Sequence, residues 1–225
     1  MILIIRGHIR NSFETKKLYN LIKKIYIKFP DLKIFIHTWN IFANNISWRE
    51  ININKKKVNI KIIVEYFDDL KHLIKKIIID DDTKINLIGN LSGKINNGLM
   101  PIIGWKNYWY GKYKIMDYIY NKNINKNEMI VNFRFDIMNN SNNFDDKTII
   151  NFIKNNSKVI QFTKNVFMFN DENHCGIDNI YIGNIDTMYK LIFKFYYDLD
   201  DILSKNKDIF HQEFLVYRIN SLLFV

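Results

Sequence analysis

The feature that most constrains the fold is an alternation of short apolar runs with amphipathic stretches at the start of the chain. Residues 2–5 form one apolar run, and residues 32–36 form a second that ends in His37-Thr38-Trp39. Between them, residues 13–29 place apolar side chains at helical spacing among lysines and stop before Pro30. A strand, a helix and a second strand in this order make a right-handed crossover between parallel strands. The pattern predicts an α/β fold with a mostly parallel central sheet and helices on both faces.

The rest of the chain continues the same alternation. Residues 129–133 are apolar and bounded by polar runs, which favours a buried strand. The other elements that the pattern predicts are strands at 58–64, 159–162, 166–169 and 178–184, and helices at 66–79, 115–120, 147–155, 188–197 and from 211 onward. The acidic triplet 80–82 is interpreted as a solvated loop, because nothing near it completes a calcium-loop spacing.

Length and composition favour one globular domain spanning residues 1–225. The chain has 48% hydrophobic and 15% aromatic residues, which excludes disorder, and no Gly/Ser-rich linker divides it. No apolar run approaches the ~20 residues of a membrane span. Cys175 is the single cysteine, which favours a reducing, cytoplasmic location.

The net charge of +10 favours an anionic partner. A phosphate-bearing ligand, peripheral contact with an anionic membrane surface, and nucleic acid all fit a basic surface. The sequence shows no helix-turn-helix, RNP or zinc-finger signature, so we do not expect nucleic acid.

The stretch 130–137 carries the most informative charged residues. Arg134 and Asp136 stand two positions apart after the buried strand, so an extended backbone would send both side chains to the same side. Open α/β sheets bind ligands at the carboxyl ends of their strands. The pair is either part of a ligand site or a local ion pair, and the residues alone leave both interpretations open.

Residues 104–113 form the densest aromatic patch, with lysines interleaved. Such a patch could stack a nucleobase or a sugar ring. A stripe of this kind is more often part of a core.

Several short motifs together resemble a known family, the small glycosyltransferases of the GT-A type found in bacterial surface-polysaccharide clusters and in large DNA viruses. The resemblance spans nearly the whole chain. Its motifs are Arg6-Gly7-His8…Arg10, His37-Thr38-Trp39, Asn132-Phe133-Arg134-Phe135-Asp136, Asp178-Asn179-Ile180-Tyr181 and Gln212-Glu213-Phe214-Leu215.

The resemblance implies a GT-A-like (Rossmann-like) sheet and an enzyme that moves a sugar from a nucleotide-diphosphate donor, UDP- or GDP-linked, to an acceptor hydroxyl of a glycan. It implies that residues 1–137 grip the donor and that 138–225 hold the acceptor. The expected donor-binding residues are Arg6, Gly7, His8, Arg10, His37, Thr38, Trp39, Arg134 and Asp136.

The expected metal ligand is Asp136, which would hold Mn²⁺ or Mg²⁺ against the diphosphate. The family's D-x-D motif here reads Arg134-Phe135-Asp136, with one of the two carboxylates absent. The alternative is that Arg134 itself neutralises the leaving diphosphate.

Two residues are expected to act on the acceptor, Asp178 after a polar loop and Glu213 at the start of the last helix. If the anomeric carbon inverts, one of these carboxylates would take the proton of the acceptor hydroxyl. A non-catalytic module that binds nucleotides or nucleic acid is the alternative function.

Overall fold

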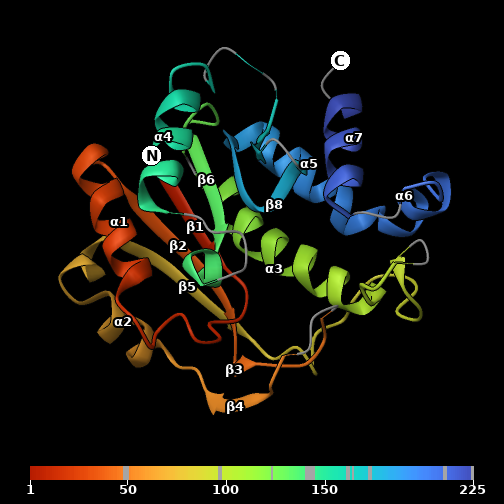
Figure 1. The fold of residues 1–225 in the computed structure, drawn as a ribbon, viewed down its shortest axis with the longest axis horizontal. Helices are drawn as coiled ribbons and strands as arrows, with labels where there is room; N and C mark the ends of the chain where they lie inside the picture. The colour runs from red at the N-terminus through yellow and green to blue at the C-terminus, as the bar shows by residue number, and fades with distance from the viewer. Residues whose placement is uncertain are drawn as a thin grey trace.

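The fold is built around one six-stranded sheet. The computed structural model describes residues 1–47, 51–95, 98–122, 124–139, 145–160, 163, 165–171, 174–209 and 212–223, with the backbone alone at 170–171, 174–179 and 212. The sheet has the order β5-β2-β1-β6-β8-β7 (Figure 1). Its strands are β1 (Ile2–Arg6), β2 (Lys33–Trp39), β5 (Ile74–Asp80), β6 (Met129–Arg134), β7 (Phe167–Asp171) and β8 (His174–Asn184).

Four neighbouring strands of the sheet are parallel. β1 pairs in parallel with β2 and β6, and β2 pairs in parallel with β5. β8 runs antiparallel to β6, and β7 antiparallel to β8. The prediction of a mostly parallel central sheet is therefore confirmed.

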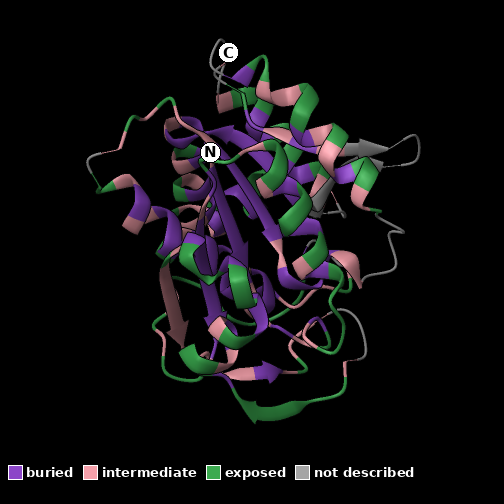
Figure 2. Ribbon diagram, turned by 90° about the vertical axis from the view of Figure 1, so that its left-hand side faces the viewer, coloured by how far each residue is buried: buried purple, intermediate pink, exposed green. Residues whose placement is uncertain are grey.

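Helices cover both faces of this sheet. On one face, Leu3 and Ile5 of β1 join an apolar cluster with α1 (Lys17–Lys28), α2 (Ile60–Phe67) and α4 (Asp146–Ser157). On the other face, Ile2 and Ile4 join a second cluster with α3 (Ile102–Tyr120), α5 (Ile185–Tyr197), α6 (Leu199–Lys205) and α7 (Gln212–Leu223). Figure 2 shows the central strands buried between helices that expose their outer faces. The two-sided helical cover is confirmed.

The segment between β2 and α3 differs from the sequence prediction. Residues 58–64 do not form a strand, because Asn59 caps α2 by accepting a hydrogen bond from the backbone of Ile62. The expected helix 66–79 ends early: Asp68 takes a positive φ of 50°, and a 3₁₀ helix (Asp68–Leu73) leads into β5. A small hairpin of β3 (Ile41–Ala43) and β4 (Asn54–Lys57) was also not predicted.

The C-terminal half follows the prediction more closely. The helices expected at 115–120, 147–155 and 188–197 lie within α3, α4 and α5. Residues 159–160 follow α4 without forming a strand, and 161–162 fall outside the described residues. Among the helices described, none combines the length and the apolar character needed to cross a bilayer.

Candidate functional site

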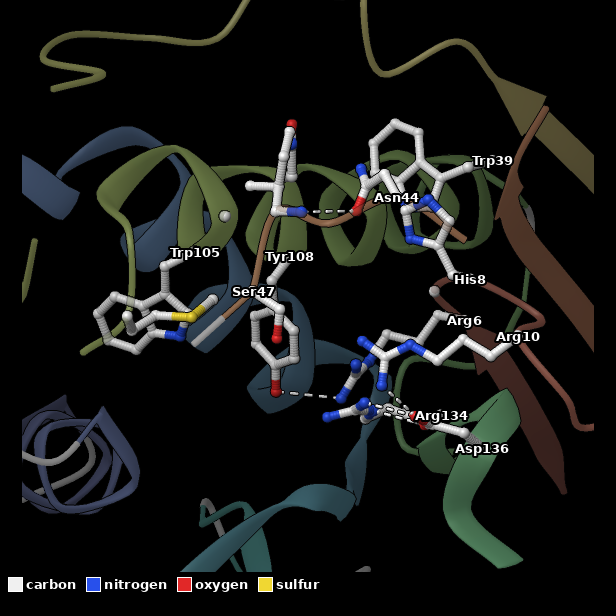
Figure 3. A pocket seen from close by; sticks show the side chains of 15 residues that line it. Arg6, His8, Arg10, Trp39, Asn44, Ser47, Trp105, Tyr108, Arg134 and Asp136 are labelled. Carbon is white, nitrogen blue, oxygen red and sulfur yellow. Dashed lines mark hydrogen bonds and ion pairs between the residues drawn. The ribbon is translucent and has the colours of Figure 1, made fainter. Parts of the chain in front are cut away.

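A pocket opens at the carboxyl ends of the parallel strands. Arg6, Trp39 and Arg134 are the last residues of β1, β2 and β6, and all three line it (Figure 3). The chain leaves β1 toward β2 on one side, and β6 joins β1 on the other side. Ligands of open α/β sheets bind at such a switch in strand order. The enclosed part of the pocket has a volume of about 100 Å³, and the pocket opens to solvent at its mouth.

Asp136 lies between two arginines in the wall of this pocket. Arg134 donates from Nε to Oδ1 at 2.8 Å and from Nη2 to Oδ2 at 2.6 Å, while Arg10 donates from Nη1 to Oδ2 at 2.6 Å. Burial alone would raise the pKa of Asp136, but the guanidinium groups of Arg134 and Arg10 hold that pKa below its usual value. The carboxylate is therefore ionised and fixes both arginines at the pocket.

Arg6 supplies a third guanidinium group and is 2% exposed. Its Nε donates to Oδ1 of Asn132 at 2.8 Å, and its Nη2 donates to the Tyr108 hydroxyl at 3.0 Å. The Tyr108 hydroxyl also lies 3.0 Å from that of Tyr181. Among the described residues that line the pocket, the ionised side chains are three arginines and one aspartate, and together they carry a net positive charge that suits an anionic ligand.

The loop after β1 is held in a shape that brings Arg10 to Asp136. Gly7 has a φ of +91° and Arg10 a φ of +53°, so the backbone turns twice through the left-handed region. The Thr38 hydroxyl donates to the carbonyl of Gly7 at 2.9 Å, and the amide of Arg10 donates to the carbonyl of Phe42 at 2.8 Å. These bonds anchor the loop to β2 and β3.

His8 lines the pocket as an uncharged group. Burial and the nearby Arg10 lower the pKa of His8 to about 3, so its ring is neutral at pH 7. Its Nε2 has no hydrogen-bond partner among the described residues and lies 4.0 Å from the carboxylate of Asp82. Asp82 also accepts a hydrogen bond from Asn44, and Asp80 bonds His37, so the prediction of a solvated acidic loop at 80–82 is wrong for these two residues.

Seven of the nine residues expected to bind the donor line the pocket, and His37 and Thr38 do not. His37 is fully buried, and its Nε2 lies 3.1 Å from Oδ2 of Asp80. Gly111 of α3 packs against this ring: a β-carbon at position 111 would stand 2.7 Å from Nδ1 of His37. His37 and Thr38 thus join the helix and the first loop to β2 behind the pocket.

Of the two expected acceptor-side acids, only Glu213 has a described side chain. Glu213 lies in the first turn of α7 and is not among the residues that line the pocket. The side chain of Asp178 is outside the described residues. Its backbone lies in β8, two positions before Ile180, which pairs with Phe133 near the carboxyl end of β6. Asp178 is therefore at the same edge of the sheet as the pocket.

The first turns of α3 supply pocket residues that sequence reasoning did not assign. Trp105, Asn107 and Tyr108 line the pocket, whereas Trp109 packs in the core and stacks on Phe195 at 4.2 Å between ring centroids. The aromatic patch 104–113 was the available signal, and it serves both as ligand-facing wall and as core.

The donor set around Asp136 does not fit a resident divalent cation. Among the described residues that line the pocket, Asp136 is the only carboxylate, and both of its oxygens accept hydrogen bonds from arginines. Across the described ranges, no group of three or more His, Cys, Asp and Glu side chains could hold a metal ion. Mn²⁺ and Mg²⁺ prefer several oxygen ligands, and neighbouring guanidinium groups repel them. The arrangement favours arginine as the group that neutralises phosphate.

Neither a scan against protein-family models nor a search of the curated proteins found a match for this chain. The proposals below therefore depend on the geometry of the pocket and on the resemblance of the motifs.

Proposed function

We propose that the protein is a GT-A-like glycosyltransferase that moves a sugar from a nucleotide-diphosphate donor to a hydroxyl group of a glycan acceptor. The observation that carries the proposal is the cluster of Arg6, Arg10 and Arg134 in a pocket at the switch point of the sheet. Guanidinium groups bind phosphate oxygens in a bidentate way and are always charged. A diphosphate placed there would meet positive charge that is already in position.

The chemistry needs that charge. When the bond between the anomeric carbon and the diphosphate breaks, negative charge collects on the phosphate oxygens of the leaving group. Fixed cations around those oxygens lower the barrier, and they cost little reorganisation if they are held in place beforehand. Asp136 holds Arg10 and Arg134 in place before a ligand binds, so its proposed role is to position these two arginines.

The nucleoside has a suitable place beside the arginines. His8, Trp39 and Asn44 lie together on the same side of the pocket (Figure 3). The neutral His8 ring can pair with a base or a ribose hydroxyl without adding charge. We assign this side of the pocket to the nucleoside of UDP or GDP.

Asp178 is the better of the two proposed bases for the acceptor hydroxyl. Its backbone lies at the edge of the sheet where the pocket opens, while Glu213 does not line the pocket. The proton of the acceptor would pass to the Asp178 carboxylate as the new glycosidic bond forms.

A non-catalytic nucleotide-binding module is the second candidate. It is favoured by one observation: the single carboxylate in the described part of the pocket lining is held by two arginines and is not free to act as a base. Such a module would bind a nucleotide sugar without cleaving it.

The test combines binding with turnover. Calorimetry with pyrophosphate, UDP and GDP should show binding to the wild type that Arg134→Ala weakens at least tenfold, while the exposed Arg218→Ala matches the wild type. Incubation with UDP- and GDP-hexoses should then release free nucleotide slowly, and Asp178→Asn should abolish that release. Binding without release identifies the module, and absence of binding by all three ligands refutes both candidates.

A further inference from the structure

Two uncharged polar groups near the start of α3 lie in the pocket wall without a partner among the described residues. Nε1 of Trp105 and Oδ1 of Asn107 are buried, and neither has a hydrogen-bond partner among the described residues. The two residues are 1% and 7% exposed, and both line the pocket. In Figure 3 the indole nitrogen of Trp105 lies on the side of its ring that faces Tyr108. Native proteins pair nearly all buried polar groups, and these two groups differ from other unpaired groups such as Nε1 of Trp109 in that their residues line a pocket, where a ligand can pair them.

This end of the pocket is also free of ionised side chains in the described lining. Trp105 lies across the pocket from Arg10, Arg134 and Asp136, with Tyr108 between (Figure 3). Lys106 does not line the pocket, because its Nζ lies 2.7 Å from Oδ1 of Asp200 and donates to the carbonyl of Ile88. Among the described residues, a ligand group that enters here meets one N–H donor, one carbonyl acceptor and aromatic surface, and no ionised side chain of the lining stands beside Trp105 and Asn107.

We propose that Trp105 and Asn107 form the sugar subsite and bind hydroxyl groups of an uncharged hexose attached to the diphosphate. The inference rests on the proposed function and names its substrate class. A sugar hydroxyl both donates and accepts, so it matches the indole N–H of Trp105 and the amide oxygen of Asn107 together. A diphosphate on the arginines, with the nucleoside beside His8 and Trp39, leaves this end for the sugar. A hexuronic acid would bring a carboxylate to a buried place where the described lining has no cation beside Trp105 and Asn107, and we expect it to be rejected.

The chain offers a matched control on the same helix. Trp109 is fully buried, its Nε1 also lacks a partner among the described residues, and its ring contacts Phe195 as the ring of Trp105 does. Trp109 does not line the pocket. Trp109→Phe therefore removes the same indole N–H and similar core volume without touching the ligand.

The experiment measures calorimetric affinities of Trp105→Phe, Asn107→Leu and Trp109→Phe for pyrophosphate, UDP, GDP, their hexose conjugates and a UDP-hexuronic acid. We expect Trp105→Phe and Asn107→Leu each to lower the affinity for the hexose conjugate about 5- to 10-fold, which is the loss typical of one or two neutral hydrogen bonds. Their affinities for pyrophosphate and free nucleotide should stay within about twofold of wild type, and Trp109→Phe should leave all affinities unchanged.

The outcomes separate the subsite from the proposed function. If Trp105→Phe and Asn107→Leu lose the same affinity for free nucleotide as for the hexose conjugate, or lose no affinity for either, the sugar subsite is overturned while nucleotide binding stands. A hexuronic acid conjugate that binds as tightly as the hexose would overturn the uncharged-sugar assignment. If the wild type binds neither pyrophosphate nor nucleotide, the proposed function fails and the subsite with it. If Trp105→Phe does not fold, Asn107→Leu alone decides.

Discussion

Arg6 and Arg134 are register partners on adjacent parallel strands, and each is the last residue of its strand. The pairing of β1 with β6 therefore sets two guanidinium groups at the same height of one edge of the sheet. Arg10 joins them from the anchored loop after β1. Because the positions of two of the three cations depend on strand pairing, we expect the anion site to be ordered before a ligand arrives.

Arg10→Ala should weaken binding of pyrophosphate, UDP and GDP by about tenfold or more. The substitution removes one charge-assisted contact with phosphate and leaves Arg134 bonded to Asp136. Calorimetry at low and at physiological salt measures the effect, which should shrink at higher salt. The exposed Arg218→Ala is the control for a change in net charge alone. Unchanged affinity in a folded Arg10→Ala protein would count against the arginine site.

Asp136→Asn should lower the stability of the protein without lowering its affinity for pyrophosphate. The carboxylate is buried and accepts hydrogen bonds from two guanidinium groups, so its loss should cost about 2 kcal/mol of unfolding free energy. The amide oxygen that replaces a carboxylate oxygen can still accept a hydrogen bond from an arginine, so the arginines should stay positioned, and the freed positive charge should keep or raise phosphate affinity. Chemical denaturation and calorimetry together test this. A loss of nucleotide affinity at unchanged stability would instead support a metal held by Asp136.

Divalent cations should not be required for nucleotide binding. The arginines supply the positive charge that a bridging metal would supply elsewhere. The thermal-unfolding midpoint with saturating UDP or GDP should therefore rise equally in excess chelator and in added Mn²⁺ or Mg²⁺. A rise of the midpoint seen only with the metal present would support the alternative hypothesis that nucleotide binding depends on a divalent metal.

Acidification below pH 6.5 should destabilise the protein through its buried histidines. Burial and Arg10 lower the pKa of His8 to about 3, and burial lowers the pKa of His37 despite its bond to Asp80. Above pH 6.5 both states carry neutral rings. Between pH 6.5 and about 3, His8 is protonated in the unfolded chain and neutral in the folded protein. The unfolding free energy therefore falls with decreasing pH, by up to about 1.4 kcal/mol per pH unit for each such histidine. His37 adds in the same direction.

Denaturant titrations at pH 7.5 and 5.5 measure this dependence, and His8→Asn supplies the comparison. The variant should lose part of the pH dependence, because it removes one of the titrating rings. An identical pH dependence in His8→Asn and the wild type would contradict the neutral, buried state of His8.

Much of the central fold could be predicted from sequence, because β1, α1 and β2 carry unambiguous periodicities. The segment 58–79 could not. The stretch 60–64 is short enough to form either a strand or a helix, and the N-cap at Asn59 favours the helix. β5 was missed because its isoleucines at 74, 77 and 78 follow helical spacing, while its pairing with β2 is a tertiary contact.

The charged half of the site could be predicted because charged residues after buried strands must lie at the edge of the sheet. The half on α3 could not be predicted. Which of Trp105, Tyr108 and Trp109 faces a ligand depends on how the helix is rotated against the sheet, and an aromatic-rich helix does not reveal its rotation. The family resemblance placed His37 in the site, but its side chain packs against Gly111 of α3 and does not line the pocket.

Gly111 packs closely against the ring of His37, so the shape of the pocket depends on two residues that do not line it. α3 can approach β2 this closely only while position 111 lacks a side chain, and Tyr108, one turn earlier on that helix, lines the pocket. A change at either position would move the helix and the pocket wall with it. Positions 37 and 111 should therefore covary among divergent relatives, a larger residue at 111 appearing where a smaller one has replaced the histidine.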